Sequence, residues 1–358
     1  MKKIVVASNS TWNLYNFRFD LINELAKKNK VYILAPKDKY INKFSNVIFI
    51  NFNFDIKSMS ILKNLKYFFF YIKKLKNIKP DFFLSFTTKP NIIGSLACIY
   101  LKINFIPNIT GLGTLFLRGF FLSYFSKIIL NFIFRYASKI YFHNIEDKNF
   151  FCHNNLYLKK KSIVIPGSGV NLKKFPFKKT EKKNFLTFLY FGRIMKDKGL
   201  NELLEAIYFI KKKKFKLTFI LVGKISEKSL KKKIHKLIKL NYIKYYKFTD
   251  SIKKYIYRSG CVILPSYREG LPKSILEAQS MGRPAIVSDV EGCRSIIKNN
   301  YNGFLFAPRS SESIIECIKR FIKLSTKERI KMSFNSYTNT KKKFNNGIIT
   351  QQYLKDIG

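Results

Sequence analysis

The chain has 358 residues, of which 47% are hydrophobic and 25% charged, as is typical of a soluble globular protein long enough for two domains. Sixty-eight Lys and Arg residues against 21 Asp and Glu give a formal charge of +47. Such a charge would attract nucleic acid, anionic membrane or acidic substrates. Because lysines are spread over the whole chain, which is also rich in Asn, Ile, Phe and Tyr, a purely compositional origin of the charge stays open.

Cysteine usage and hydropathy exclude several classes of protein. Five cysteines, odd in number and unclustered, predict neither a disulfide framework nor a zinc site, and they fit a reducing cytosol. The apolar stretch at residues 1–7 is too short for a signal peptide and predicts a first strand. The most apolar run, residues 115–134, is interrupted by Arg118 and Lys127, so no membrane-spanning helix is predicted.

Short apolar runs alternate with helical patterns along the chain, which predicts parallel sheets with helices on both faces. The first series of runs is 4–7, 31–35, 47–50, 82–86, 105–109, 140–143 and 163–166. A polar stretch at 171–184 predicts a linker, and a second series follows at 186–191, 217–222, 245–248, 261–265, 284–288 and 303–306. The predicted fold class is therefore α/β, with two doubly wound Rossmann-like domains (1–170 and 185–340) facing across a cleft and a terminal helix at 341–358. Chemistry is expected at the carboxyl ends of the strands.

Two segments of the first half are both basic and apolar. Residues 61–78 place Leu62, Leu65 and Phe69 at helical spacing, with lysines between them, and residues 119–141 are similarly aromatic and basic. This pattern is typical of helices that lie on a membrane surface. An ordinary core-facing helix in a lysine-rich protein has the same pattern, so both interpretations stay open.

A glycine-flanked loop follows the run at 186–191. Gly192, Arg193, Lys198 and Gly199 come before the helical pattern that begins at Leu200. Arg193 offers a fork of hydrogen-bond donors and Lys198 a point charge, the two features that bind a diphosphate.

Two carboxylates stand eight residues apart after the run at 261–265. Glu269 is expected on a strand-to-helix loop, and Glu277 about two turns up the following helix, with Pro272 at the first helical position and Gly282 as the stop. The N-terminal end of that helix suits phosphate, and the carboxylates suit hydroxyl groups. A ligand with a sugar at each end of a diphosphate would satisfy both; the alternative is that both glutamates are merely solvated.

These segments together resemble the family 4 retaining glycosyltransferases of the GT-B fold. The matching motifs are Phe191-Gly-Arg193 with Lys198-Gly199, Leu264 to Pro272, Leu276-Glu277-Ala, Met281 to Pro284, and Asp289 to Arg294 with Asn302-Gly303-Phe. The resemblance implies that Arg193 and Lys198 hold the diphosphate of a sugar nucleotide, that Glu277 binds the ribose and that Glu269 binds the donor sugar. The main chain around Gly192, Gly270, Leu271 and Pro272 is expected to face the donor.

The first half resembles the bacterial subgroup that extends lipid-linked oligosaccharides, which includes N-acetylgalactosaminyltransferases. The residues expected on the acceptor side are Asn16, Arg18, Lys89, Asn91, Thr110 and Gly111. One departure is the stretch from Ser8 to Tyr15, where many members of the family have a glycine-rich loop after the first strand.

The resemblance implies a retaining hexosyltransferase, with GalNAc from UDP-GalNAc as the first expectation and an undecaprenyl-diphosphate-linked sugar as acceptor. A different donor and acceptor on the same fold is the alternative. Transfer would serve bacterial surface polysaccharide or glycan assembly, at the inner face of the cytoplasmic membrane, and an anionic membrane surface is a candidate partner. No Asp-x-Asp motif occurs, so no metal cofactor is expected.

Two other classes of function are weaker. The charge and the aromatic residues would suit nucleic-acid binding, but no nucleic-acid module is recognised and no such partner is expected. A dinucleotide-dependent oxidoreductase fits the fold but lacks Gly-x-Gly-x-x-Gly after either first strand. The three histidines, His143, His153 and His235, are expected to be structural or exposed.

Overall fold

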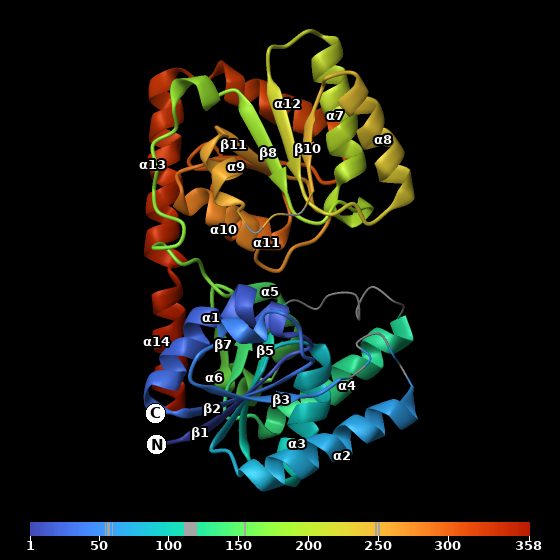
Figure 1. Ribbon diagram of the computed structural model, residues 1–358, viewed down its shortest axis with the longest axis vertical. Helices are drawn as coiled ribbons and strands as arrows, with labels where there is room; N and C mark the ends of the chain where they lie inside the picture. The colour runs from blue at the N-terminus through green and yellow to red at the C-terminus, as the bar shows by residue number, and fades with distance from the viewer. Residues whose placement is uncertain are drawn as a thin grey trace. The chain divides into compact units, whose positions relative to one another are not determined.

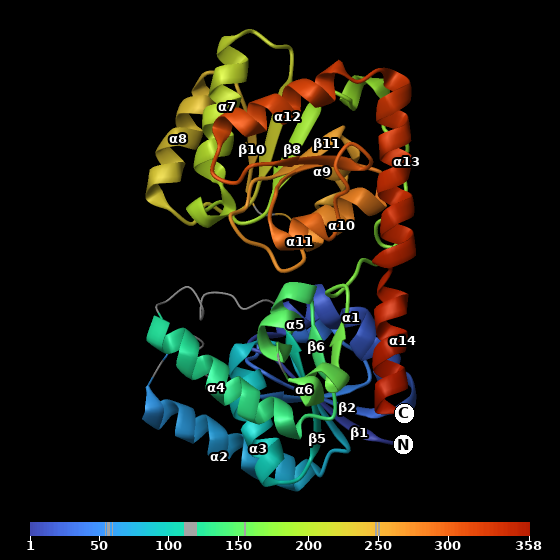
Figure 2. The same cartoon turned by 180° about the vertical axis from the view of Figure 1, so that it is seen from behind.

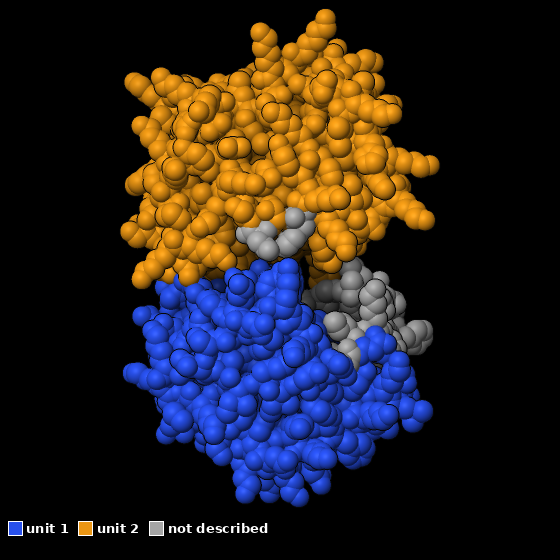
Figure 3. Space-filling view, in the orientation of Figure 1, with its two compact units in different colours: residues 1–168, 346–358 blue, residues 169–345 orange. Residues whose placement is uncertain are grey.

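The computed structural model describes residues 1–53, 55, 58, 60–110, 120–153, 155–247, 249 and 251–358. It divides into two compact units, residues 1–168 with 346–358 (unit 1) and residues 169–345 (unit 2), coloured separately in Figure 3. Each unit is a parallel sheet flanked by helices, which confirms the predicted α/β class with two doubly wound, Rossmann-like domains.

Unit 1 contains a seven-stranded sheet of order β3-β2-β1-β4-β5-β6-β7. Its strands are β1 (Lys3–Ala7), β2 (Lys30–Ala35), β3 (Val47–Asn51), β4 (Phe82–Ser85), β5 (Asn104–Ile109), β6 (Ile140–Phe142) and β7 (Ser162–Val164). All neighbours are parallel, and β1 pairs with β2 on one side and β4 on the other. The strand order therefore reverses between β1 and β4.

Two helical layers cover this sheet (Figures 1 and 2). One layer consists of α1 (Thr11–Lys28) and α14 (Asn346–Ile357), whose buried residues share one core cluster. The other layer consists of α2 (Ile61–Ile78), α3 (Ser95–Tyr100), α4 (Phe120–Tyr136), α5 (Ile145–Cys152) and α6 (Leu156–Lys161). Short turns are η1 (Ile41–Lys43) and the π-helical η2 (Pro90–Gly94).

Unit 2 contains a six-stranded parallel sheet of order β10-β9-β8-β11-β12-β13. Its strands are β8 (Thr187–Phe191), β9 (Thr218–Val222), β10 (Lys244–Tyr246), β11 (Cys261–Leu264), β12 (Ala285–Ser288) and β13 (Gly303–Phe306). Its helices are α7 (Leu200–Lys212), α8 (Lys228–Lys239), α9 (Lys253–Tyr257), α10 (Lys273–Ser280), α11 (Glu291–Arg294), α12 (Ser311–Lys323) and α13 (Thr326–Lys343), with 3-10 turns η4 (Lys182–Asn184) and η5 (Lys196–Lys198). Apart from the edge strand β10, whose Lys244 and Tyr246 are exposed, these strands are largely buried, as parallel strands between two helical layers are.

The two connections between the units differ from the sequence expectation. Segment 171–184, expected as a linker, packs onto unit 2: Phe175 is buried in its core, and Arg283 donates to the Lys178 carbonyl at 2.6 Å. The helix expected over 341–358 is two helices, because α13 ends at Lys343 and α14 starts at Asn346 and joins unit 1. Buried residues of α14 complete the core of unit 1, a long-range contact that local sequence does not encode.

Within the part of the chain that the structure describes, every helix is too short or too polar to cross a bilayer.

Candidate active site

The strand order in the sheet of unit 2 reverses between β8 and β11. β8 pairs with β9 on one side, with Phe191 opposite Val222, and with β11 on the other, with Val262 opposite Leu189. In doubly wound sheets, ligands bind outside the carboxyl ends of the strands at this point. The loop with Arg193 and Lys198 follows β8, and the loop with Glu269 follows β11, so the sequence-predicted residues of both loops leave the sheet at this position.

The structure brings Lys198 and Glu269 into direct contact. The ammonium group of Lys198 donates to Oε1 of Glu269 at 2.5 Å, and both side chains are largely buried. The hydroxyl of Ser266 donates to the same oxygen at 2.6 Å. Two donors therefore converge on one carboxylate oxygen, which fixes the orientation of Glu269.

Glycines and a loop-to-loop hydrogen bond shape the segment after β8. Gly192 has φ +151° and Gly199 has φ +67°, backbone conformations that side chains disfavour. A Cβ atom on Gly199 would lie 1.9 Å from the carbonyl oxygen of Pro265, so this glycine allows the two loops to touch. The amide of Tyr267 also donates to the carbonyl of Asp197 at 3.0 Å.

Arg193 projects from this loop and is exposed. Its carbonyl accepts a hydrogen bond of 2.6 Å from the hydroxyl of Tyr190, a buried residue of β8. The backbone of Arg193 is therefore held from inside the sheet, while its guanidinium stays accessible.

Glu277 lies on α10, which begins four residues before it, at Lys273. Pro272 caps the helix instead of occupying its first position, with ψ 106°, so Glu277 stands just over one turn from the helix start and not two. Gly282 ends the helix with φ +77°, the expected stop. Burial raises the pKa of Glu277, and Lys273 and Lys174 partly offset this rise.

The remaining residues expected at the donor lie between Glu269 and α10. Gly270 and Leu271 are half-buried and Pro272 is buried. A Cβ atom on Gly292, in α11, would lie 2.3 Å from the carbonyl oxygen of Gly270 and 2.5 Å from that of Glu269. The glycine lets α11 press against this loop and support it.

The residues expected on the acceptor side differ in their burial and in their hydrogen-bond partners. Arg18 is buried, donates to His143 Nε2 at 2.9 Å and to the Gly167 carbonyl at 3.3 Å, and stacks on Phe86. Because arginine only donates, His143 accepts and is neutral; burial and then Arg18 hold its pKa well below the usual value. This agrees with the expectation that His143 is structural.

Asn91 is also buried, and its side chain bonds both the amide and the carbonyl of Asn108 in β5. Lys89 donates to the carbonyl of Asp55 at 2.6 Å, and Asn16 donates to a carbonyl one turn back in α1 at 2.9 Å. Thr110 is exposed after β5. Gly111 lies outside the described residues.

Sequence reasoning missed Ser266, Tyr190 and Gly292. Ser266 lies within the quoted motif, and a hydroxyl three residues before a carboxylate was the available signal. Tyr190 reads as an ordinary strand residue, and Gly292 as one small residue among others. Their contacts join segments far apart in sequence, which a single sequence does not show.

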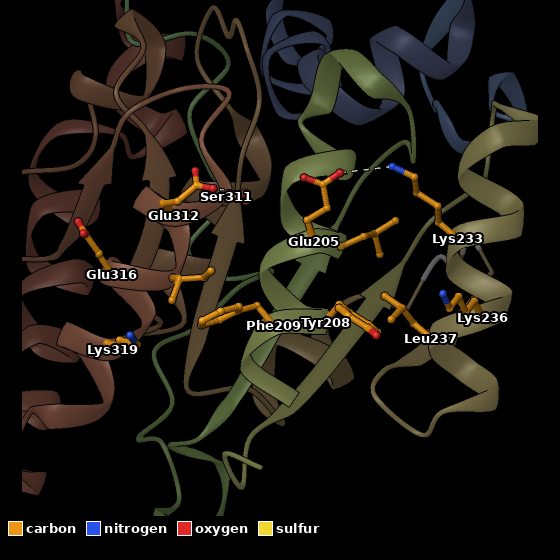
Figure 4. A pocket seen from close by; sticks show the side chains of 12 residues that line it. Glu205, Tyr208, Phe209, Lys233, Lys236, Leu237, Ser311, Glu312, Glu316 and Lys319 are labelled. Atoms are coloured by element: carbon orange, nitrogen blue, oxygen red, sulfur yellow. Dashed lines mark hydrogen bonds and ion pairs between the residues drawn. The ribbon is translucent and has the colours of Figure 1, made fainter. Parts of the chain in front are cut away.

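A pocket of about 640 Å³ opens elsewhere on unit 2, between α7, α8 and α12 (Figure 4). Apolar side chains such as Phe209 and Leu237 lie among three glutamates and three lysines, and none of the expected site residues lines it. Among the described residues, no cluster of three or more His, Cys, Asp or Glu side chains suits a metal ion.

Family models match nearly the whole chain. Residues 172–339 match the glycosyl transferases group 1 model, and residues 3–144 match the glycosyl transferase 4-like model. These matches and the two Rossmann-like domains identify a glycosyltransferase of the GT-B fold. The chain is therefore a glycosyltransferase, with a group 1 C-terminal half and a 4-like N-terminal half.

Two curated relatives align over most of the chain. The N,N'-diacetylbacillosaminyl-diphospho-undecaprenol alpha-1,3-N-acetylgalactosaminyltransferase of Campylobacter jejuni is 29% identical over 99% of this chain and 97% of the relative. The UDP-Gal:alpha-D-GlcNAc-diphosphoundecaprenol alpha-1,3-galactosyltransferase of Escherichia coli is 27% identical over 86% of this chain and 81% of the relative.

The fold also matches solved structures. The crystal structure of Anabaena HepE in complex with UDP and glucose aligns with a TM-score of 0.81 and 18% identity, covering 99% of both chains. At this identity the likeness concerns the fold.

Proposed function

We propose that the protein is a retaining, family 4 glycosyltransferase that moves a hexose or N-acetylhexosamine from a nucleotide diphosphate to an undecaprenyl-diphosphate-linked sugar. The observation that carries the proposal is the meeting of Lys198 and Glu269, 2.5 Å apart, from loops that follow adjacent strands at the reversal of the sheet. The cation, Lys198, can bind phosphate, and the carboxylate, Glu269, can accept hydrogen bonds from sugar hydroxyls.

The donor is assigned to unit 2. Lys198 and Arg193 bind the diphosphate, with the N-terminal end of α10 adding its positive dipole. Glu277 accepts from the ribose hydroxyls, and the free oxygen of Glu269 accepts from the transferred sugar. Support for UDP as the nucleotide comes from the E. coli relative, which uses UDP-Gal, and from the Anabaena protein, which binds UDP and glucose.

The acceptor class is supported more broadly than the donor sugar. The C. jejuni and E. coli relatives transfer different sugars, yet both act on undecaprenol diphosphate carriers. GalNAc is the donor sugar we favour, because the C. jejuni relative aligns along nearly the full chain. Such a carrier places the reaction at the cytoplasmic face of the membrane, in the assembly of a surface polysaccharide or glycan.

The reaction keeps the anomeric configuration. Both relatives form α-1,3 linkages, which means retention when the donor sugar is α-linked to its nucleotide. The acceptor oxygen bonds to the anomeric carbon on the face from which the phosphate oxygen departs, and that phosphate oxygen takes the acceptor proton. Lys198, Arg193 and the helix end stabilise the charge on the leaving diphosphate in place of a metal ion.

The test compares site variants with matched variants elsewhere in unit 2. Glu277→Ala and Arg193→Ala are expected to lower transfer at least a hundredfold, because each removes a charged contact to the donor. Glu316→Ala and Arg320→Ala, on the exposed face of α12, are expected to keep the parent rate. The assay measures transfer from a panel of sugar nucleotides to a short-chain lipid diphosphate sugar, with and without a metal chelator.

Transfer near the parent rate in Glu277→Ala or Arg193→Ala would refute the site. Loss of activity on chelation would refute the metal-free chemistry, and a glycosyl group trapped on a carboxylate would refute same-face attack. A donor other than UDP-GalNAc giving the highest rate would replace GalNAc while leaving the site assignment intact.

A further inference from the structure

α2 carries apolar side chains on two faces. Tyr71, Leu75 and Ile78 are buried against the sheet of unit 1. Four others are exposed: Ile61 by 77%, Leu62 by 79%, Leu65 by 47% and Phe69 by 63%. Their spacing places them along one stripe over consecutive turns. Single exposed apolar residues are ordinary, but a contiguous group of large ones marks an interaction surface.

The neighbouring helix α4 repeats this arrangement. Ile128, Phe132 and Tyr136, spaced four residues apart, are exposed, while Ile133 and Phe134 are buried. Both α2 and α4 contact α3 and cover the same face of the sheet (Figures 1 and 2). We call the exposed apolar residues of these two helices, together with the lysines of α2, the α2–α4 surface.

The charge of this surface is of one sign. α2 contains five lysines and no acidic residue: Lys63, Lys66, Lys73, Lys74 and Lys76. From residue 60 to 136 the sequence holds a single acidic residue, Asp81. By contrast α1, on the other face of the sheet, carries Asp20 and Glu24. The absence of acidic residues is therefore a property of α2, α3 and α4, beyond the basic composition of the whole chain.

We propose that the α2–α4 surface docks the protein on an anionic lipid bilayer, with its apolar side chains at the boundary between headgroups and acyl chains. Lysines beside these side chains would contact lipid phosphates, each contributing about fivefold in affinity near an anionic membrane. The choice of a bilayer rests on the proposed function, because the acceptor is lipid-anchored.

Other occupants fit the surface less well. A symmetric dimer through α2 would bring two sets of five lysines together, and like charges repel at such a contact. Single-stranded nucleic acid would gain from stacking on rings, whereas Ile61, Leu62 and Leu65 are aliphatic. A bilayer accepts both aliphatic and basic groups.

Vesicle flotation of the full-length chain tests the proposal. Mixed phosphatidylcholine and phosphatidylglycerol vesicles are expected to carry the protein upward, and pure phosphatidylcholine vesicles to carry much less. Leu65→Ser with Phe69→Ser is expected to lower binding about tenfold or more. The matched control, Phe209→Ser with Leu240→Ser, removes the same residue types from unit 2, where each is 43% exposed, and is expected to bind like the parent.

Charge variants separate the basic contribution. Lys66→Glu with Lys73→Glu is expected to reduce binding to anionic vesicles at least 25-fold, at about fivefold per lysine. Lys231→Glu with Lys232→Glu makes the same change of charge on α8 and is expected to have a much smaller effect. An equal loss in both pairs would show that total charge alone drives binding and would overturn the docking surface.

Fluorescence gives an independent reading, since Trp12 is the chain's one tryptophan. Phe69→Trp in a Trp12→Phe background is expected to shift its emission to the blue with anionic vesicles. No shift, or a dimer in sedimentation that Leu65→Ser with Phe69→Ser dissociates, would overturn the proposal. Transfer to a water-soluble acceptor should be unchanged by these substitutions, so a parent protein that floats without any transferase activity would refute the proposed function and leave docking intact.

Discussion

Glu269 gives one carboxylate oxygen to two donors of its own unit, Lys198 and Ser266. Both bonds go to Oε1, so the position of the carboxylate is set before any ligand arrives. Such preorganisation lowers the cost of binding, because the side chain has little freedom left to lose. Ser266 thereby acts as a positioning residue for Glu269.

The protonation of Glu277 should make donor affinity depend on pH. Burial raises its pKa above the ordinary value of 4.5, so its carboxylate begins to take up a proton at a higher pH than an exposed glutamate. Protonation removes charge-assisted acceptance from ribose, worth roughly tenfold or more in affinity. We expect the affinity for a UDP-sugar, measured by calorimetry, to fall as pH is lowered from neutral towards 4.5. Glu277→Gln should be weaker at neutral pH and flat over this range, and a parent-like slope in it would contradict the assignment.

The raised pKa of Glu277 also affects the stability of the fold, and here the dependence on pH is opposite to that of donor binding. In the window between 4.5 and the raised pKa, the folded protein holds a proton on Glu277 that the unfolded chain has lost. The contribution of this group to the free energy of unfolding therefore declines as pH rises through that window. Ionised Glu277 costs stability at neutral pH, as a group kept for binding does.

Single residues were harder to predict than their motifs. Arg18 is an expected acceptor-side residue and Arg193 and Arg283 lie within the quoted motifs, but of these three arginines only Arg193 is exposed. Arg283 is buried and donates to four backbone carbonyls, and burial lowers its pKa to about 10. What separates a ligand-binding arginine from one that joins loops is the position of distant carbonyls, and no local pattern encodes that.

Elements were predictable where the chain repeats a simple period. Each apolar run predicted as a strand overlaps one of the thirteen strands in the described part of the chain, because buried parallel strands need continuous apolar sequence. The start of α10 was wrong by one residue, since a proline can serve equally as N-cap or first helical residue. The break between α13 and α14 was missed because Phe344 and Asn345 carry no strong breaker, and the change of unit is fixed by packing.

α14 is expected to support unit 1 through Tyr353, which is fully buried, packs on Tyr141 at 4.6 Å and donates to Asn108 in β5. Tyr353→Ala should lower the free energy of unfolding of unit 1 by about 3–5 kcal/mol. Leu354→Ala, exposed on the same helix, should change it by less than about 0.5 kcal/mol. Urea unfolding followed by fluorescence of Trp12, which lies in α1 of unit 1, gives the comparison. Equal midpoints for the two variants would show that α14 contributes little to this core.

The whole molecule carries a formal charge of +47, because its 68 Lys and Arg residues far outnumber its 21 Asp and Glu residues. Mutual repulsion should destabilise the folded state most at low salt, where the Debye length is about 30 Å, compared with about 8 Å at 0.15 M. We expect the melting temperature to rise with sodium chloride by about 2–4 °C, equivalent to about 1 kcal/mol. Potassium chloride should act equally, and a flat or falling curve would mean that the lysines are too dispersed to repel one another appreciably.

The return of α14 to the first sheet makes unit 1 discontinuous along the chain. Lys2 donates to the carbonyls of Ile357 and Gly358 at 2.6 Å, so residues from both ends of the sequence lie together (Figure 1). During synthesis on the ribosome, residues 169–345 emerge before α14, the helix that completes the core of unit 1. The whole of unit 2 is therefore available for folding before the sequence of unit 1 is complete. Unit 1 and unit 2 are also joined by two covalent connections instead of one, at 168–169 and at 345–346. Two connections restrict rotation of one unit against the other more than a single connection would.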